Sequence, residues 1–321
     1  MNTKSNVLAY LIENMEENIS GEKIASELNI SRTAIWQAIN KLKEIGHNIE
    51  SNGNKGYRYI KSDIISEEGI RHYFSGENKD ITIKYFDEID STNKQAKIDA
   101  PTIKDERTIY VTGYQTGGYG RFSRNFVGEK GGGIYISIIL KPSKALDVIP
   151  LITVKTAVAA KSAIDKFAGT DVKIKWINDL FLNGKKISGI LTEGVTDYES
   201  GNISTIIIGI GINFYIEKFP SELKEIAGSI FDKKPDDITK NQLIGEFINN
   251  FFTLYDEQDN KKIIDEYREG LFILEKEVVF VKNSEEYKGI AKDVTENGEL
   301  IVETKEKERM ILNSGEISIK L

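Results

Sequence analysis

The sequence predicts an α+β protein of two or three domains, and three observations support this fold class. Its 321 residues exceed the usual length of one compact domain. The expected strands and helices of the central segment do not alternate strictly, which favours a mixed sheet with helices on one side over a doubly wound parallel sheet. Helices dominate the first segment and short strands the last. We therefore predict domains at residues 1–62, 63–271 and 272–321.

Composition narrows the chemistry that the chain can perform. The net charge is −7, there are no cysteines, and His47 and His72 are the two histidines. Disulfides and thiolate metal sites are therefore excluded, and a zinc site or Ser-His or Cys-His nucleophilic catalysis is disfavoured. No apolar run reaches the ~20 residues of a membrane helix, and the amino terminus lacks a signal-peptide pattern. We expect a cytoplasmic protein with no membrane partner.

Residues 1–62 are predicted to form three short helices and a hairpin. Apolar residues recur at helical spacing in "VLAYLIENMEE", "SGEKIASELN" and "ISRTAIWQAINKLKEIG". Ser20 and Ser31 can cap the second and third helices, and Gly46 is a stop signal. Residues Ala34, Ile35, Ala38, Ile39 and Leu42 form one stripe that we expect to be buried. "HNIESNGNKGYRYI" is typical of two strands around a turn.

This order of elements resembles a winged helix-turn-helix, which indicates DNA binding. The alternative is a small protein-interaction domain whose polar face is merely solvated. Because the charge of this segment is nearly balanced, we expect useful DNA affinity only when two copies bind together. The candidate DNA-binding residues are Arg32, Thr33, Gln37, Asn40, Lys41, Lys55 and Arg58.

The remaining segments supply the central sheet and a small barrel. Central strands are expected at "ITIKYF", "TIYVTG", "GIYISIIL", "VKIKW", "KISGILTEGV" and "ISTIIIGIGINF". Helices are expected at "IPLITVKTAVAAKSAIDKFAG", "KNQLIGEFINNFFTLYDEQ" and "KKIIDEYREGLF". The last 50 residues contain short strands, with Asn297-Gly298 as a hairpin turn, and we predict a small β-barrel there.

The loop "GYQTGGYGRFSRNF" combines glycine with positive charge. Gly117, Gly118 and Gly120 allow the backbone to approach a ligand and to point amide N–H groups at it. Arg121 and Arg124 suit a carboxylate or a phosphate. The alternative is a mobile surface loop with solvated arginines.

Three further stretches are candidates for the same site. In "KIKWINDLFLNGKKISGI", Asn178 and Asp179 end a strand, and Lys185 and Lys186 point to opposite faces of the next one, although both lysines could be solvated. In "IIIGIGINF", period-two alternation leaves a slot that suits a flat ring, although close helix packing also explains the glycines. In "FDEIDSTNKQA", Ser91, Thr92 and Asn93 form a polar cluster that could instead cap a helix.

The chain resembles the bifunctional biotin–protein ligase and biotin-operon repressor family over essentially its whole length. The resemblance rests on the motifs "DEIDSTN", "QTGGYGRFSR", "KWINDL" with "GKKISGI", "GIGINF" and a terminal "GEIS". The resemblance implies a winged helix-turn-helix, a central mixed-sheet catalytic domain similar to class II aminoacyl-tRNA synthetases, and an SH3-like β-barrel. It implies that biotin and ATP form biotinyl-5′-AMP, with Mg²⁺, and that biotin passes to a lysine of a biotin carboxyl carrier protein. It also implies an adenylate-bound homodimer on operator DNA.

The resemblance also implies residue roles. Catalysis is assigned to Lys186 and Arg121, and a possible metal contact to Asp179. Biotin is assigned to Ser91, Thr92, Asn93, Gln115, Gly118, Tyr119, Gly120, Arg121 and Lys186. The nucleotide is assigned to Arg124, Phe126, Asn178, Gly209, Gly211 and Asn213.

The chain departs from the family pattern in the glycine-arginine loop and after Trp176. In the motif G-R-G-R-x-G-R, Tyr119 replaces the first arginine and Ser123 the last glycine, and Ile177 replaces the proline of "KWPNDL". Phe126 stands where tryptophan is frequent. We expect the loop to be disordered when empty and to order around the adenylate. Two other functions stay open, namely a biotin-sensing repressor without catalysis and a lipoate ligase-like acyltransferase.

Overall fold

The computed structural model describes residues 2–104, 107–126, 129–141, 149–196, 203–282, 285–315 and 317–319. The chain divides into two compact units, Met1–Lys79 with Pro235–Glu246, and Asp80–Lys234 with Phe247–Leu321. The three-domain boundaries at residues 62 and 271 stay a prediction. Glu316 of the "GEIS" motif lies outside the described residues.

Three helices open the first unit, α1 (Thr3–Glu13), α2 (Gly21–Leu28) and α3 (Arg32–Glu44). The two predicted caps are confirmed, because Ser20 Oγ accepts from Lys23 N at 3.1 Å and Ser31 Oγ from Ala34 N at 3.2 Å. The buried stripe of α3 is Ile35, Ala38, Ile39 and Leu42, packed with the apolar face of α1. Ala34 is only partly buried, unlike the prediction.

The predicted hairpin follows α3. Strands β1 (Ile49–Ser51) and β2 (Tyr57–Tyr59) pair antiparallel around the 3-10 turn η1 (Gly53–Lys55). His47 is buried, and its Nδ1 lies 3.0 Å from Tyr59 Oη, which joins the segment after α3 to β2. Burial, and secondarily the positive charge of Lys4, lowers the pKa of His47 to about 4. The predicted winged helix-turn-helix is therefore confirmed as a fold.

A short helix that the sequence patterns did not reveal completes this unit. Helix α4 (Glu67–His72) begins at Ser66, whose Oγ accepts from Gly69 N, and it packs against α1. Asn241 Nδ2 donates to Ile64 O just before it. A 3-10 turn, η2 (Gly76–Asp80), follows α4 along the chain.

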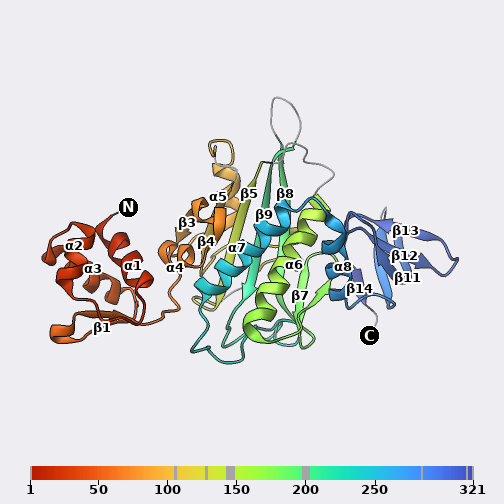
Figure 1. Ribbon diagram of the computed structural model, residues 1–321. Helices are drawn as coiled ribbons and strands as arrows, with labels where there is room; N and C mark the ends of the chain where they lie inside the picture. The colour runs from red at the N-terminus through yellow and green to blue at the C-terminus, as the bar shows by residue number, and fades with distance from the viewer. Residues whose placement is uncertain are drawn as a thin grey trace. The chain divides into compact units, whose positions relative to one another are not determined.

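The second unit is built on a seven-stranded mixed sheet of order β3-β4-β5-β9-β8-β7-β6 (Figure 1). Strands β3 and β4 are parallel and the other neighbouring pairs are antiparallel, which confirms the predicted mixed sheet. The strands are β3 (Thr82–Phe86), β4 (Thr108–Thr112), β5 (Gly133–Leu140), β6 (Lys173–Lys175), β7 (Asp179–Leu182), β8 (Lys185–Thr196) and β9 (Ile203–Asn213).

Helices pack on both faces of this sheet. Helix α6 (Ile149–Ala168) packs on β8, where Thr153 Oγ1 lies 2.8 Å from Thr192 Oγ1, and α8 (Asn260–Gly270) packs beside α6. Helix α7 (Lys240–Asp256) begins in the first unit and ends in the second. The expectation of helices on one side is wrong for α5 (Thr92–Asp99), which packs on the face that carries Gly209. Its small residues Ala96 and Ala100 allow this close packing.

The carboxy-terminal segment is a five-stranded antiparallel sheet of order β13-β12-β11-β10-β14. The predicted Asn297-Gly298 turn joins β11 to β12, with Gly298 at φ +80°. Trp176 Nε1 donates to Gly298 O at 2.9 Å, so the turn packs against the central sheet. The strands are β10 (Glu277–Lys282), β11 (Glu285–Val294), β12 (Leu300–Thr304), β13 (Arg309–Leu312) and β14 (Ile317–Ile319). No helix in the described ranges has the length and apolar character needed to cross a membrane.

Candidate active site

The face of the central sheet that carries α5 holds a cavity of about 610 Å³. Fourteen of the predicted ligand-binding residues line this cavity. They come from distant segments of the chain, and the fold brings them together. They are Ser91, Thr92, Asn93, Gln115, Tyr119, Gly120, Arg121, Arg124, Phe126, Asn178, Lys186, Gly209, Gly211 and Asn213, and the metal candidate Asp179 lies with them. The predicted Gly118 is not part of the described lining.

Glycines form the floor of the cavity. The sheet register places Gly211 between Tyr135 and Gly189, and Gly209 between Ser137 and Leu191. A Cβ on Gly209 would lie 2.3 Å from Asn93 Oδ1, and one on Gly211 would lie 2.7 Å from Phe126 Cε1. The predicted open slot for a flat ring is therefore wrong at these two positions, because side chains of α5 and of the loop already cover them. Gly209 serves close packing against a helix.

A polar cluster occupies one end of the cavity. Thr92 N donates to Gln115 Oε1 at 2.7 Å, and Thr92 Oγ1 does so at 3.1 Å. The fully buried Ser137 Oγ lies 2.7 Å from Thr92 Oγ1 and 2.5 Å from Asn93 Oδ1. Ser91 both caps α5 and lines the cavity, so the two interpretations of this residue are compatible. These hydroxyl and amide groups can bind a small polar ring by hydrogen bonds.

The glycine-arginine loop closes on itself as a small hairpin over residues 118–126. Phe126 N donates to Gly118 O at 3.0 Å and Gly120 N to Arg124 O at 2.8 Å, with the 3-10 turn η3 (Arg121–Ser123) at the tip. Gly117 N donates to Asp90 O. The expectation that these glycine amides point at a ligand is therefore wrong for Gly117 and Gly120, whose N–H groups are used within the chain.

The tip of this hairpin has an unusual backbone conformation. Phe122 and Ser123 have φ of 55° and 57°, in the left-handed region where side chains are disfavoured. Ser123 stands where the family motif has glycine, and glycine adopts this conformation without steric cost. The Trp176–Ile177 peptide bond, at the other departure from the family pattern, is cis.

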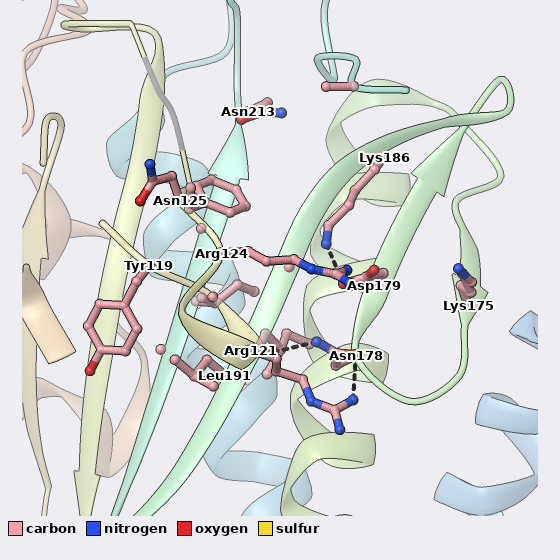
Figure 2. Close-up of a pocket in the computed structure, with 18 of the residues that line it drawn as sticks. Tyr119, Arg121, Arg124, Asn125, Lys175, Asn178, Asp179, Lys186, Leu191 and Asn213 are labelled. Atoms are coloured by element: carbon pink, nitrogen blue, oxygen red, sulfur yellow. Dashed lines mark hydrogen bonds and ion pairs between the residues drawn. The ribbon is translucent and has the colours of Figure 1, made fainter. Parts of the chain in front are cut away.

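The cationic side chains of Arg121, Arg124 and Lys186 gather near Asn178 and Asp179 (Figure 2). Lys186 Nζ lies 2.6 Å from Asp179 Oδ1, and Arg121 Nη1 donates to Asn178 Oδ1 at 3.4 Å. Figure 2 shows Arg124 extending from the hairpin toward Asp179. The described lining holds four cations, the three above and Lys175, against the two carboxylates of Asp179 and Glu225, so the site attracts anions.

The adjacent lysines have different surroundings, as the strand alternation predicted. Lys186 lines the cavity, whereas Lys185 Nζ donates to Lys224 O at 2.9 Å and is outside the described lining. The backbone of Lys186 pairs with residues 226 and 228, because its N donates to Ile226 O and its O accepts from Gly228 N. The segment around Ile226 thereby becomes part of the cavity wall.

The described residues do not form a metal centre. They include no group of three or more His, Cys, Asp or Glu side chains that could hold a metal ion. Asp179, the predicted metal ligand, is paired with the Lys186 ammonium, which a cation would have to displace. The described residues therefore do not fit a metal ion held by the protein alone.

Several lining or supporting residues were not predicted. Gly189 lies on the floor, Ser137 supports the polar end, and Glu193 links α5 to the hairpin. A single polar residue in the apolar run "GIYISIIL" and a single carboxylate in "GILTEGV" were the available signals. Lys175, Phe219, Leu223, Ile226, Gly315 and Ile317 also line the cavity.

The predicted DNA-binding residues fall into two groups. The first group is exposed or half-buried on α3 and η1. The exposed residues are Arg32, Thr33, Gln37, Lys41 and Lys55, and Asn40 is half-buried. Arg58 differs, because its guanidinium lies 2.5 Å from Glu16 Oε2 and 3.8 Å from Glu50 Oε2. Trp36, which is not among the candidate DNA-binding residues, is 57% exposed on the same face of α3.

Comparison with known proteins agrees with this architecture. The profile of the biotin/lipoate A/B protein ligase family matches residues 85–213, an HTH domain profile matches residues 3–58, and the biotin protein ligase C terminal domain profile matches residues 273–320. Biotin protein ligase from Aquifex aeolicus in complex with biotin and ATP has the same fold, with a TM-score of 0.62, 23% identity, and coverage of 74% of this chain and 98% of that one.

Fold and cavity together define a protein ligase of the biotin/lipoate class that carries a helix-turn-helix domain. The bifunctional ligase/repressor BirA of Bacillus spizizenii is 39% identical over 242 residues, 74% of this chain and 74% of that protein. The protein of the same name from Escherichia coli is 22% identical over 306 residues, 94% of this chain and 93% of that protein. This chain belongs to the family of bifunctional biotin–protein ligases and repressors.

Proposed function

We propose that the cavity of this ligase binds biotin between the Thr92–Gln115 cluster and Lys186, and ATP between Lys186 and Phe126. One observation carries the proposal: Arg121, Arg124 and Lys186 converge on a single cavity whose other end is polar and uncharged. Biotin has a neutral polar ring and a carboxylate tail, whereas ATP is strongly anionic. The two ends of the cavity match these two requirements.

The reaction needs positioning and charge neutralisation more than acid–base groups. The biotin carboxylate attacks the α-phosphorus of ATP, a P–O bond forms, and pyrophosphate leaves, giving biotinyl-5′-AMP. Lys186 neutralises the carboxylate and the α-phosphate, whose mutual repulsion otherwise opposes the approach. A lysine amine of the carrier protein then attacks the acyl carbon, and AMP leaves. Arg121, held by Asn178, stabilises the phosphate in both steps.

The nucleotide end has both a stacking and a hydrogen-bonding group. Phe126 lies over Gly211, and its ring is nearly perpendicular to that of Tyr135 at a centroid distance of 6.1 Å. We propose that it offers a face to the adenine ring. Asn213 is 5% exposed, its Nδ2 donates to Gly228 O, and its buried Oδ1 has no partner among the described residues. A base amine can satisfy that oxygen. Gly118 contributes through the hairpin pairing rather than by lining the site.

The adjacent lysines provide a matched test of this assignment. Biotin-dependent exchange of labelled pyrophosphate into ATP should fall at least ~100-fold in Lys186→Ala, since a preorganised charge at the reacting group is lost. Lys185→Ala should retain exchange within about twofold, because Lys185 lies outside the described cavity lining and its Nζ donates to Lys224 O. Equal loss in both variants, or none in either, would refute the role of Lys186.

The same assay decides between the alternative functions. A sensor without catalysis would bind biotin and show no exchange in the parent protein. A lipoate ligase-like enzyme would show exchange with lipoate that biotin competes with poorly. Mass analysis of a carrier domain for one added biotin establishes the second step.

We further propose, for the repressor role, that adenylate binding promotes a homodimer through the central sheet and that the dimer binds operator DNA through α3 and the hairpin. Mg²⁺ is proposed to enter with the phosphates of ATP, and a cytoplasmic location stays a prediction. Sedimentation with and without biotin and ATP, together with selection from a random-sequence duplex pool, tests the dimer and the DNA site. DNA retention that biotin and ATP leave unchanged would contradict the coupling.

A further inference from the structure

Three side chains outside the hairpin, those of Glu193, Lys97 and Lys94, contact Tyr119. Its hydroxyl donates to Glu193 Oε2 at 3.0 Å and accepts from Lys97 Nζ at 3.1 Å. Lys97 Nζ also lies 5.6 Å from the centre of the tyrosine ring, and Lys94 Nζ lies 5.8 Å from it. Figure 2 shows the ring directed away from Lys186 and Arg124. Tyr119 therefore lines the cavity with one side and fastens the hairpin with its tip.

Glu193 is the centre of this attachment. Its carboxylate also accepts from Lys97 Nζ at 2.7 Å and from Asn93 Nδ2 at 2.9 Å, and its side chain is only 21% exposed. Asn93 in turn contacts Ser137 beneath the polar cluster. The hairpin is thus joined by hydrogen bonds to the residues proposed to bind the biotin ring. Hydrogen bonds in which one partner is charged are stronger than hydrogen bonds between neutral groups.

The charges around Tyr119 suit a neutral aromatic side chain. Lys97 is paired with Glu193 and Lys94 with Asp90, so each cation near the ring already has its carboxylate. Burial raises the pKa of Tyr119, the Lys97 bond opposes this rise and Glu193 adds to it, so the hydroxyl stays protonated and can donate. An arginine at this position would be a third cation beside Lys94 and Lys97.

We propose that Tyr119 is a positioning residue that, matched to Lys97 and Glu193, fastens the 118–126 hairpin over the cavity and so slows loss of the acyl-adenylate. The effect on the acyl-adenylate rests on the proposed function. The attachment of the hairpin through Tyr119 does not depend on it. The attachment consists of the protein's own side chains, so it acts before a ligand arrives. Restoring an arginine at position 119 alone therefore weakens the hairpin in this chain, and neutralising Lys97 as well restores it.

Trypsin tests the attachment without any ligand, because Arg121 and Arg124 lie in the hairpin. In the full-length protein, Tyr119→Phe should raise the cleavage rate at these arginines at least about tenfold, because the hydroxyl loses its hydrogen bonds to both Glu193 and Lys97. The control Tyr114→Phe, a tyrosine of the same loop outside the described lining, should cleave as the parent does. Tyr119→Arg should cleave faster than the parent, and Tyr119→Arg with Lys97→Met should return to within about twofold of it.

The lifetime of bound biotinyl-5′-AMP tests the consequence. Tyr119→Phe should shorten it about tenfold, while the rate of transfer from the adenylate that remains bound should change little. Glu193→Gln provides a second variant that keeps the shape of the anchor and removes its charge, and it should behave like Tyr119→Phe. Cleavage of Tyr119→Phe at the parental rate, or slower cleavage of Tyr119→Arg, would overturn the proposal. If the parent forms no adenylate, the proposed function fails, and the trypsin series still decides the role of Tyr119.

Discussion

Lys186 and Asp179 form an ion pair inside the cavity, with Nζ and Oδ1 2.6 Å apart, on neighbouring strands β8 and β7. The pair fixes the ammonium at the end of the cavity where Arg121 and Arg124 also lie. The Asp179 carboxylate lowers the positive charge of the site, but the site keeps a net positive charge. We propose that Asp179 orients Lys186, and the metal contact assigned to Asp179 stays a prediction.

Asp179→Asn should lower kcat for adenylate formation about tenfold, because Lys186 keeps its charge and loses the group that orients it. The KM for ATP should stay equal or fall, since the cavity becomes more positive. Steady-state kinetics of pyrophosphate release measure both constants. An unchanged kcat would show that Lys186 is positioned without Asp179.

Phe126→Ala should raise the KM for ATP about tenfold while the KM for biotin changes less than about threefold, since the ring is proposed to stack on adenine. Phe126→Trp should preserve both constants, because a tryptophan offers a larger face. Initial-rate measurements with each substrate varied in turn distinguish these results. An equal rise in both KM values would instead point to a general collapse of the hairpin.

Gly211→Ala should displace the Phe126 ring, because the new Cβ would lie 2.7 Å from its Cε1. Gly209→Ala should displace Asn93, where the distance to Oδ1 would be 2.3 Å. We expect the first variant to weaken ATP binding and the second to weaken biotin binding. Isothermal titration of each ligand checks this division, and the reverse pattern would contradict the assignment of the two ends.

Acid should destabilise the first unit through His47. The folded pKa, about 4, is below the unfolded value of 6.5, so the unfolded state takes up the proton first as pH falls. The contribution is fully present above pH 6.5 and is lost as pH falls toward 4, and the loss reaches about 2.5 kcal/mol by pH 4.5. Calorimetry of the full chain at pH 7 and 4.5 should show this loss in the parent and a smaller one in His47→Gln.

Lys41 and Arg58 should respond differently in DNA binding. Lys41 is exposed on α3, and its removal should weaken binding to a random-sequence duplex and reduce the salt slope by about one. Arg58 is paired with Glu16 and Glu50, so Arg58→Ala should change the salt slope less. Filter binding over a range of salt concentrations measures both, and equal slopes in the two variants would show that Arg58 exchanges its partners for phosphate.

Features that depend on neighbouring residues were determined by the sequence. Ser20 and Ser31 cap their helices, Asn297-Gly298 makes its turn, and Lys185 and Lys186 take opposite surroundings. Each follows from a local rule, namely side-chain capping, left-handed turn geometry or strand alternation. The four motif stretches also identified most of the cavity lining, because the family pattern records which distant segments meet.

Contacts between distant segments were decided by the tertiary structure. Asn93 and Glu193 are 100 residues apart, and only the packing of α5 on the sheet brings them together. The same packing closes the space above Gly209, which alternation alone left open. Arg58 pairs with Glu16 because β2 lies beside the end of α1. No local sequence pattern predicts that these two elements are neighbours. Local rules fix the direction of a side chain, whereas its partner depends on which elements pack together.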